Sequence, residues 1–131
     1  MPRYYDPNLA PDPQAWLALK EDVRIAQAEV FHKKRRIRVP GLTAHATFHA
    51  IVENQIAQGM DAVVRAVPRL MDQGLSRHDA IHALGWVLSQ HLYELMNTDQ
   101  PDEPGVANAR YAAEVERLQA KDWMSQGNDD E

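Results

Sequence analysis

The chain has 131 residues, of which 44% are hydrophobic and 25% are charged, and it carries a formal net charge of −5 and no cysteine. This composition predicts one soluble globular domain over residues 1–131, and the lack of cysteine excludes disulfides, thiolate metal sites and a cysteine nucleophile. The acidic balance disfavours nucleic-acid binding, no apolar run approaches the roughly 20 residues of a bilayer span, and the cytoplasm is the expected location.

Residues 1–13 are predicted to form an extended arm, because prolines at positions 2, 7, 11 and 13 prevent a regular helix. The arm lacks the apolar segment of a secretory signal. Tyr4 and Tyr5 offer two aromatic rings that can dock on the body of the domain. Pro13 suits the first turn of a helix, which is expected to follow it.

One long helix is predicted over about residues 14–36. Its apolar side chains recur every three or four residues, which places Trp16, Leu19, Val23 and Val30 on one buried face. The helix ends in the basic run HKKRRIR, whose positive charges suit the negative end of the helix dipole.

Two helices are predicted in the next stretch. The first begins near Thr43 as its N-cap and ends at about Gln58, because Gly59 suits the left-handed end of a helix. Asp61 can cap the second helix, which runs to about residue 73 and which Pro68 must kink or split.

A polar loop separates the last two predicted helices. Ser76 and Asp79 form an acidic variant of the capping box, so a helix is predicted from there to about Asn97. After the loop NTDQPDEPG, a fifth helix is predicted over residues 106–123, and residues 124–131 are expected to be a frayed acidic tail.

The predicted fold is an all-α antiparallel bundle of four to five helices, with the extended proline-rich arm at its start. The sequence has no strand-like alternation, no internal repeat and no low-complexity tract. Short loops between the middle helices favour antiparallel neighbours. A helical homodimer is one expected assembly.

Two pairs of histidines carry the strongest functional signal. His45 and His49 lie in HATFHAIVE, and His78 and His82 lie in RHDAIH. Residues four apart sit one turn above each other on the same side of a helix. By helical phase His45 lies within an apolar stripe, and the other three histidines lie on the flank of one, so both pairs are expected to face a neighbouring helix. If the two helices pack together, the four imidazoles meet across the bundle.

Glu53 follows His49 by one helical turn and adds a carboxylate to this group. Two histidines at this spacing can bind one metal ion from a single helix face, and neutral imidazole suits zinc, iron, copper and nickel. A water on such an ion can act as hydroxide, which makes hydrolysis a candidate activity with Glu53 as the catalytic base. The sequence therefore predicts a transition metal ion, zinc or iron first, bound by His45, His49, Glu53, His78 and His82.

A non-enzymatic helical interaction module is the competing hypothesis, in which the same histidines are hydrogen-bonded core residues. Metal-free acid–base catalysis by the histidine pairs with Glu53 is a further alternative, but no nucleophile in a recognisable motif lies beside them. The one Glu-x-x-His motif, Glu29–His32, lies off the buried face by helical phase and is expected to be solvated. The lack of a second such motif argues against a carboxylate-bridged di-iron site. His91, on the other edge of its helix, is expected to be structural.

The basic run from His32 to Arg38 has two interpretations. It can contact phosphate or RNA, which predicts binding that weakens steeply with salt. The favoured interpretation is a solvated helix end, since the run lacks the interleaved aromatics that stack on bases. Nucleic acid is therefore not the expected partner, and the sequence names no small-molecule ligand.

The stretch HATFHAIVENQIA, together with LMDQGLSRHDAIHALGWVLSQHLYEL, resembles a family of small bacterial proteins known as a domain of unknown function. Its pattern is a His-x3-His helix followed by an acid or amide pair and Gln, and then a second His-x3-His helix followed by Leu-Gly. Relatives are expected to carry a carboxylate one turn after the second pair, where this chain has Trp86, and this departure weakens a symmetric two-metal site. The resemblance covers residues 42–97 and implies a helical histidine site with no established reaction. The matching residues are His45, His49, Asn54, Gln55, His78, His82, Leu84 and Gly85.

Overall fold

The structure is a computed structural model that describes residues 5–34, 42–98, 103 and 105–125. Within these ranges the chain is helical and forms no strand, which confirms the predicted all-α class. The helices are α1 (Pro13–Ala18), α2 (Glu21–Lys34), α3 (Leu42–Ala57), α4 (Asp61–Asp72), α5 (Arg77–Met96), α6 (Val106–Arg117) and α7 (Ala120–Met124).

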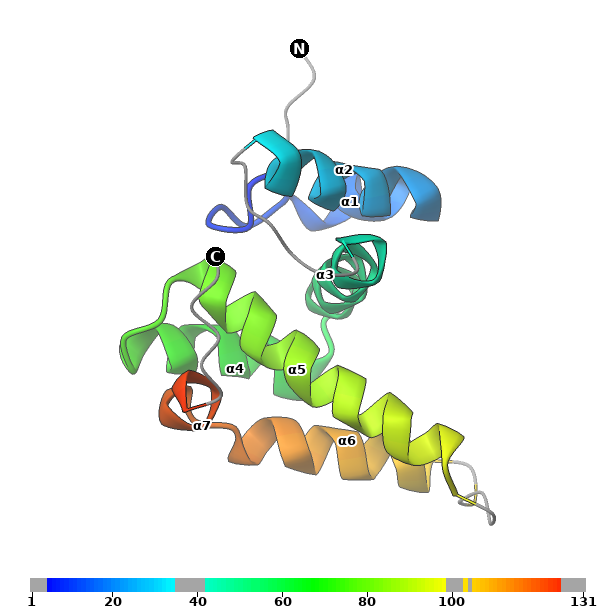
Figure 1. The fold of residues 1–131 in the computed structure, drawn as a ribbon, viewed down its shortest axis with the longest axis vertical. Coiled ribbons are helices and arrows are strands. Elements are labelled where there is room, and N and C mark those ends of the chain that lie inside the picture. Colours follow the sequence, from blue (N-terminus) through cyan, green and yellow to red (C-terminus); the bar gives the residue numbers. More distant parts are fainter. Residues whose placement is uncertain (1–4, 35–41, 99–102, 104, 126–131) are drawn as a thin grey trace.

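The helices form a bundle in which α3 occupies the middle (Figure 1). α1 and α2 run in opposite directions and form one outer layer against α3. α5 and α6 lie side by side and also run in opposite directions, while α4 packs against both of them. α3 is seen nearly end-on in this view, so it crosses the helices on either side of it. α3 therefore joins the α1–α2 layer to the rest of the bundle.

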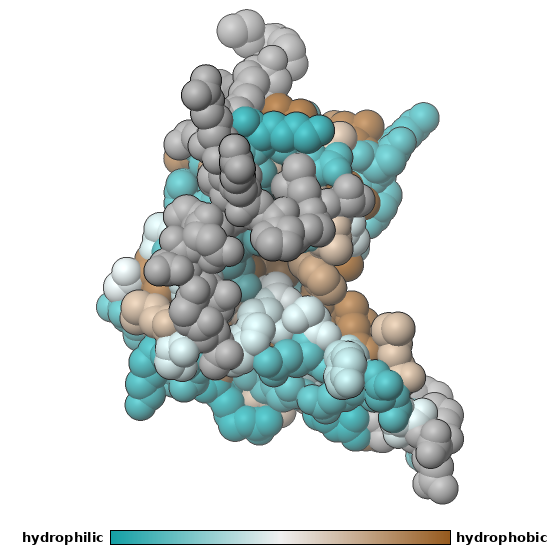
Figure 2. Space-filling view, in the orientation of Figure 1, coloured by the Kyte–Doolittle hydropathy of each residue, from teal (hydrophilic) through white to brown (hydrophobic). Residues whose placement is uncertain are grey.

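The buried apolar side chains form two clusters. The larger cluster lies mainly between α4, α5, α6 and α7, with Leu70, Ile81, Leu84 and Val115 among its fully buried members. The smaller cluster joins the N-terminal segment, α1, α2 and α3. On the face drawn in Figure 2, hydrophobic side chains gather at the narrow level of α3, whereas the edge along α6 is mostly hydrophilic. The buried members of the smaller cluster are Tyr5, Trp16, Ala28, Phe31, Ala46 and Ala50.

The prediction of a single helix over residues 14–36 is wrong, because the helix is interrupted after α1 in the described part of this stretch. Leu19 has an extended backbone there, with φ −75° and ψ 149°. The guanidinium of Arg24 donates hydrogen bonds to the carbonyls of Leu17 (2.9 Å) and Leu19 (3.0 Å). These bonds stabilise the corner, because they satisfy acceptors that the break leaves without helical partners.

The corner also shifts the buried face of α2. Phe31 and His32 are buried, with exposed fractions of 6% and 0%, whereas Val23, which was expected inside, is 37% exposed. A helix turns by about 100° per residue, so a change of phase of one residue at the corner is enough to replace the inward face. The expectation that the Glu29–His32 motif is solvated is therefore wrong for His32.

α3 and α4 lie close to their predicted bounds. α3 begins one residue before Thr43, so this residue lies in the first turn and is not the N-cap. Gly59 follows α3 with φ +76°, a left-handed conformation that glycine adopts without strain. Pro68 does not split α4, and the N-cap of that helix is Met60 rather than Asp61.

α5 has the predicted start and end. The hydroxyl oxygen of Ser76 accepts a hydrogen bond of 3.0 Å from the backbone N–H of Asp79. Asn97 is the C-cap. This N-terminal cap fixes where α5 begins and therefore which of its residues face α3.

The fifth helix predicted over residues 106–123 is also wrong as a single helix, because it is divided into α6 and α7. Leu118 is extended between them, with φ −64° and ψ 131°. Arg69 of α4 donates hydrogen bonds to the carbonyls of Val115 (2.9 Å) and Leu118 (3.0 Å), which ends α6. The change of direction buries Trp123, and its ring centroid lies 6.4 Å from that of His82.

The N-terminal arm is described from Tyr5, which is buried on the body of the protein as expected for a docked ring. Tyr4, residues 126–131 of the acidic tail and residues 35–38 of the basic run lie outside the described ranges. Met124, predicted to be part of the tail, belongs to α7. Among the described residues, none of the helices has both the length and the apolar composition for crossing a membrane.

Candidate metal centre

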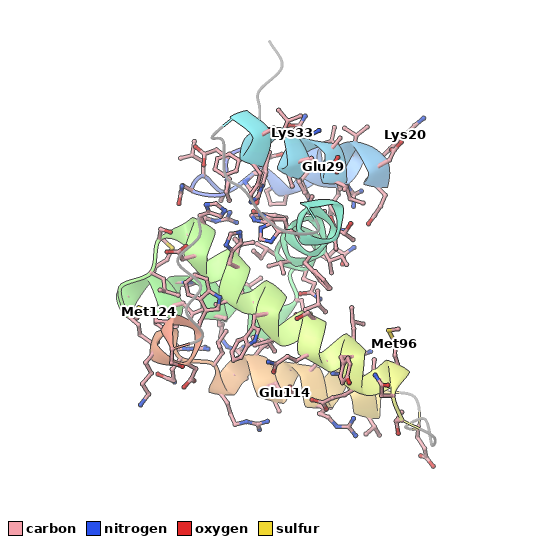
Figure 3. The ribbon with its side chains drawn as sticks, in the orientation of Figure 1. Lys20, Glu29, Lys33, Met96, Glu114 and Met124 are labelled. Carbon is pink, nitrogen blue, oxygen red and sulfur yellow. The ribbon has the colours of Figure 1, made fainter. Side chains whose placement is uncertain are left out.

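Five imidazoles meet where α2, α3 and α5 pack together. One comes from α2, two come from α3 and two come from the first turns of α5. Figure 3 shows nitrogen-bearing rings gathered between these three helices. The ring centroids of one α5 pair are 4.2 Å apart, and α2 and α3 bring two centroids to 4.6 Å. The five residues are His32, His45, His49, His78 and His82.

The two His-x3-His pairs face each other because α3 packs directly against α5. His45 and His49 project from α3 toward His82, as the helical phase predicted. The small residue Gly85 lies in the same interface. A Cβ atom added there would be 3.6 Å from Cβ of Phe48, an ordinary van der Waals separation. The helix approach is close, although it would also tolerate alanine at this position.

Four of the imidazoles are positioned to share one ion. One nitrogen from each of His32, His49, His78 and His82 belongs to a set whose members all lie within 4.8 Å of one another. The Nε2 atoms of His49 and His82 are 2.7 Å apart. Nε2 of His45 lies 2.9 Å from the same nitrogen of His82. The helices α2, α3 and α5 thus bring ring nitrogens into one small volume.

Hydrogen bonds outside the cluster define the proton positions on two rings. Nδ1 of His32 is 2.8 Å from the carbonyl oxygen of Ala28, so Nδ1 carries a proton and Nε2 has the lone pair in the neutral ring. Nδ1 of His49 is 3.2 Å from the hydroxyl oxygen of Tyr5. That hydroxyl donates its only proton to Glu53, at 2.5 Å, so His49 must donate from Nδ1 and keep the lone pair on Nε2.

A buried ion pair lies behind His49. Both oxygens of Glu53 accept hydrogen bonds from the guanidinium of Arg77, at 2.8 and 2.9 Å. The two side chains are only 1% and 7% exposed. The pairing is bidentate, which is the geometry in which an arginine and a carboxylate hold each other most firmly.

Burial and neighbouring charges shift the pKa values of three groups at this site, which are His49, Tyr5 and Arg77. Burial lowers the pKa of His49 well below 6.5, and the surrounding imidazoles lower it further. Burial, followed by the charge of Glu53, raises the pKa of Tyr5 well above 10.0. Burial acts to lower the pKa of Arg77, but its hydrogen bonds to the carboxylate and the attraction between their charges raise it overall. His49 is therefore neutral and able to bind a metal near neutral pH.

Three of the five predicted ligands belong to the group of four, and the other two lie beside it. His49, His78 and His82 belong to the group of four, and His45 contacts it through His82. Glu53 lies one step outside, where its oxygens are engaged by Arg77 and Tyr5. Its predicted roles as metal ligand and catalytic base remain predictions.

His32 is the fourth member of the group, and it was not among the predicted ligands. The Glu-x-x-His motif was recognised in the sequence, but the prediction of one continuous first helix placed its histidine on the wrong face. The roles of Tyr5 and Arg77 had no motif at all. A buried arginine directly before His78 carries no local pattern, and the contact of Tyr5 with α3 spans more than forty residues of sequence.

The remaining predicted features lie away from the cluster. His91 is buried 5.2 Å from the ring of Tyr111, with Nδ1 3.9 Å from a carboxylate oxygen of Glu114. Gln55, one of the residues that carry the resemblance, accepts a hydrogen bond of 2.8 Å from Tyr111. Trp86, which stands where the resemblance leads us to expect a carboxylate, packs against the larger apolar cluster.

Comparisons of this chain with protein-family models, with curated proteins and with solved structures give no match. The resemblance to a bacterial family with paired histidine helices therefore stays a prediction. The structure shows a helical bundle over the described residues, with a buried histidine cluster that can hold a metal ion.

Proposed function

We propose that this chain is a metal-binding protein that holds one transition metal ion between α2, α3 and α5, and that zinc is the preferred ion. The ligands are the imidazoles of His32, His49, His78 and His82. The ion joins the α1–α2 layer to α5 through α3 and so stabilises the bundle. The observation that carries the proposal is the convergence of four ring nitrogens within 4.8 Å of one another in a buried place.

The spacing of the nitrogens supports this proposal. Zinc binds imidazole nitrogen at about 2.0–2.1 Å in a tetrahedral arrangement, which separates the four nitrogens by roughly 3.3 Å. In the group of four, separations of up to 4.8 Å must contract, and the 2.7 Å between the Nε2 atoms of His49 and His82 must widen, to reach that geometry. Ligand movements of this size are within the reach of side-chain rotation.

The proton positions support it further. With the lone pair of His49 on Nε2, a hydrogen bond to His82 requires the proton to be on Nε2 of His82. Nε2 of His82 is also 2.9 Å from Nε2 of His45. The one proton of His82 must then serve both contacts, because a proton on Nε2 of His45 would face a nitrogen of His82 that has no lone pair. An ion bound by His49 and His82 removes the need for a proton between these two nitrogens, because it accepts a lone pair from each ring. The outer hydrogen bond of His32 to a backbone carbonyl is of the kind that usually orients metal-binding histidines.

The ligand chemistry favours zinc and its neighbours over hard cations. Calcium and magnesium prefer oxygen ligands, whereas the four proposed ligands are all imidazole nitrogens. Zinc, cobalt, nickel and copper accept such a set, and zinc accepts it in the tetrahedral form. Iron is less favoured than the sequence alone indicated, because the carboxylate of Glu53 is held by Arg77.

Four nitrogen ligands leave no position for water, so we assign the ion a structural role rather than a hydrolytic one. Closed four-coordinate sites are typical of structural zinc, and catalytic sites keep a position open. Hydrolysis with Glu53 as the base would also require a free carboxylate oxygen, and both oxygens accept hydrogen bonds from Arg77.

Zinc titration of tag-free protein tests the proposal. The wild-type protein is expected to bind one equivalent per chain. His49→Ala and His78→Ala are expected to lose at least an order of magnitude in affinity. His91→Ala is the matched control, because it removes a buried imidazole of α5 that lies outside the group of four.

Two results would overturn the proposal. One is a wild-type protein that binds less than about 0.1 equivalent of zinc, cobalt, nickel or copper after incubation, which would favour the interaction module whose histidines are core residues. The other is an equal loss of affinity in the three variants, which would mean that binding follows overall stability and not these ligands.

A further inference from the structure

The N-terminal segment of residues 5–8 packs over the histidine cluster. Tyr5 and Pro7 are buried, and the backbone N–H of Tyr5 donates a hydrogen bond of 2.9 Å to the side chain of Gln27. The carbonyl of Pro7 accepts a hydrogen bond of 2.9 Å from Arg77, and the side chain of Asn8 accepts one of 3.1 Å from the backbone N–H of His78. Three residues of this segment, Tyr5, Pro7 and Asn8, thus contact α2, α3 and α5.

The hydroxyl of Tyr5 is the point where this segment meets the proposed ligands. It donates to Glu53 at 2.5 Å, and its oxygen lies 3.2 Å from Nδ1 of His49. This links the carboxylate to the imidazole through one oxygen atom. Carboxylates commonly orient metal-binding histidines by direct contact, and here the tyrosine provides that connection at one remove.

Arg77 fixes the other end of this connection. It holds both oxygens of Glu53 and the carbonyl of Pro7, so one guanidinium joins the ion pair to the N-terminal segment. The next residue in the chain is His78, one of the four proposed ligands. A displaced segment would remove a partner from Arg77 and a partner from His49 at the same time.

We propose that Tyr5 is a positioning residue of the metal site, and that docking of residues 5–8 is thermodynamically coupled to metal retention. This inference rests on the proposed metal binding. Tyr5 contacts no metal itself and acts through His49, whose ring it orients and whose lone pair it keeps directed into the cluster. Because coupling between two binding events is reciprocal, a bound ion in turn holds the segment in place.

Tyr5→Phe tests the inference against the matched variant Tyr111→Phe. Both changes remove one hydroxyl from a buried tyrosine, and only the first hydroxyl reaches the site. The zinc dissociation constant, measured by competition with a chelator, is expected to rise roughly 10- to 100-fold for Tyr5→Phe. It is expected to stay within about twofold of wild type for Tyr111→Phe. The visible absorption of the cobalt-substituted site is expected to change only in Tyr5→Phe, because it reports the ligand field and not stability.

Limited proteolysis tests the reciprocal half of the coupling. Zinc is expected to slow cleavage near residues 5–8 in the wild-type protein, and this protection is expected to weaken in Asn8→Ala. That variant removes the hydrogen bond to the backbone of His78 and leaves every proposed ligand intact. It also gives a second reading if Tyr5→Phe does not fold.

The outcomes separate this inference from the proposed function. A wild-type protein that binds no zinc would end both. A wild-type protein that binds zinc, together with a Tyr5→Phe variant that binds it with unchanged affinity and spectrum, would end only the coupling. Equal weakening in Tyr5→Phe and Tyr111→Phe would also overturn it, since the effect would then come from stability alone.

Discussion

The two apolar clusters of this protein differ in what surrounds them. The larger cluster, between α4, α5, α6 and α7, consists of aliphatic and aromatic side chains in direct contact. The smaller cluster has six buried apolar residues and borders the histidines and the ion pair of Glu53 with Arg77. The first region is stabilised by the burial of apolar surface. The second also depends on satisfied polar groups, so it is expected to respond strongly to changes in charge, metal and pH.

The largest expected effect is that of breaking the buried ion pair. Arg77→Met leaves the carboxylate of Glu53 buried without its partner, which typically costs about 3–5 kcal/mol of unfolding free energy. The double variant Glu53→Gln/Arg77→Met removes both charges and is expected to recover a large part of this loss. Urea unfolding of the three proteins measures both effects. Equal stabilities for the single and double variants would contradict a charge-based explanation.

The second effect is stabilisation by zinc, and it should be confined to one region. Free zinc at about 100 times its dissociation constant adds roughly 2.7 kcal/mol to the unfolding free energy. Hydrogen exchange is expected to slow in α2, α3 and the first turns of α5, with little change in α6. The same slowing throughout the bundle would show that the two regions unfold as one unit and would remove the contrast between them.

The third effect is acid destabilisation of the metal-free protein. The pKa of His49 lies well below 6.5 in the folded chain because of burial and then the neighbouring imidazoles, so below pH 6.5 the unfolded chain binds more protons. Stability is therefore complete above that pH and declines as the pH falls, by at most about 1.4 kcal/mol per pH unit for one proton. The imidazoles of His32, His45, His78 and His82 surround this ring, with Tyr5 on its other side.

Thermal unfolding of the metal-free protein between pH 7.5 and 5.5 measures this decline. His49→Asn is expected to flatten it, since the variant removes the group whose protonation changes on unfolding. A melting temperature that rises as the pH falls would have the wrong sign.

The smallest effect is expected at the surface of the larger region. Arg65 bonds to Asp61 on its own helix and to Glu116 of α6, and all three side chains are well exposed to solvent. Exposed ion pairs contribute little, because water and salt screen them. Arg65→Ala is expected to leave the melting temperature and the zinc affinity within experimental error. A clear decrease in the melting temperature or in the zinc affinity would contradict the small contribution that we assign to these exposed ion pairs.

The sequence predicted the parts of the site that lie on regular helices. The i,i+4 spacing of His45 with His49 and of His78 with His82 depends only on helix geometry, and the cap at Ser76 fixed where α5 begins. These local features were enough to predict that the two pairs meet.

The parts that were missed depend on tertiary contacts. The corner at Leu19 is stabilised by the side chain of Arg24, and the end of α6 is stabilised by Arg69 from another helix. Neither has a strong local signal such as Pro or Gly, so both helices were predicted to be continuous. The first error turned His32 away from the cluster. The sequence indicated that Tyr5 can dock, but not that its hydroxyl reaches His49 and Glu53, because these contacts join segments far apart in the sequence.

X-ray absorption of the zinc-loaded protein tests the central claim most directly. The claim predicts four nitrogen neighbours at about 2.0 Å, with the outer-shell scattering of four imidazole rings, and one ring fewer in His32→Ala. A shell dominated by oxygen with two or fewer imidazoles, or a spectrum that His32→Ala leaves unchanged, would contradict a site built from α2, α3 and α5.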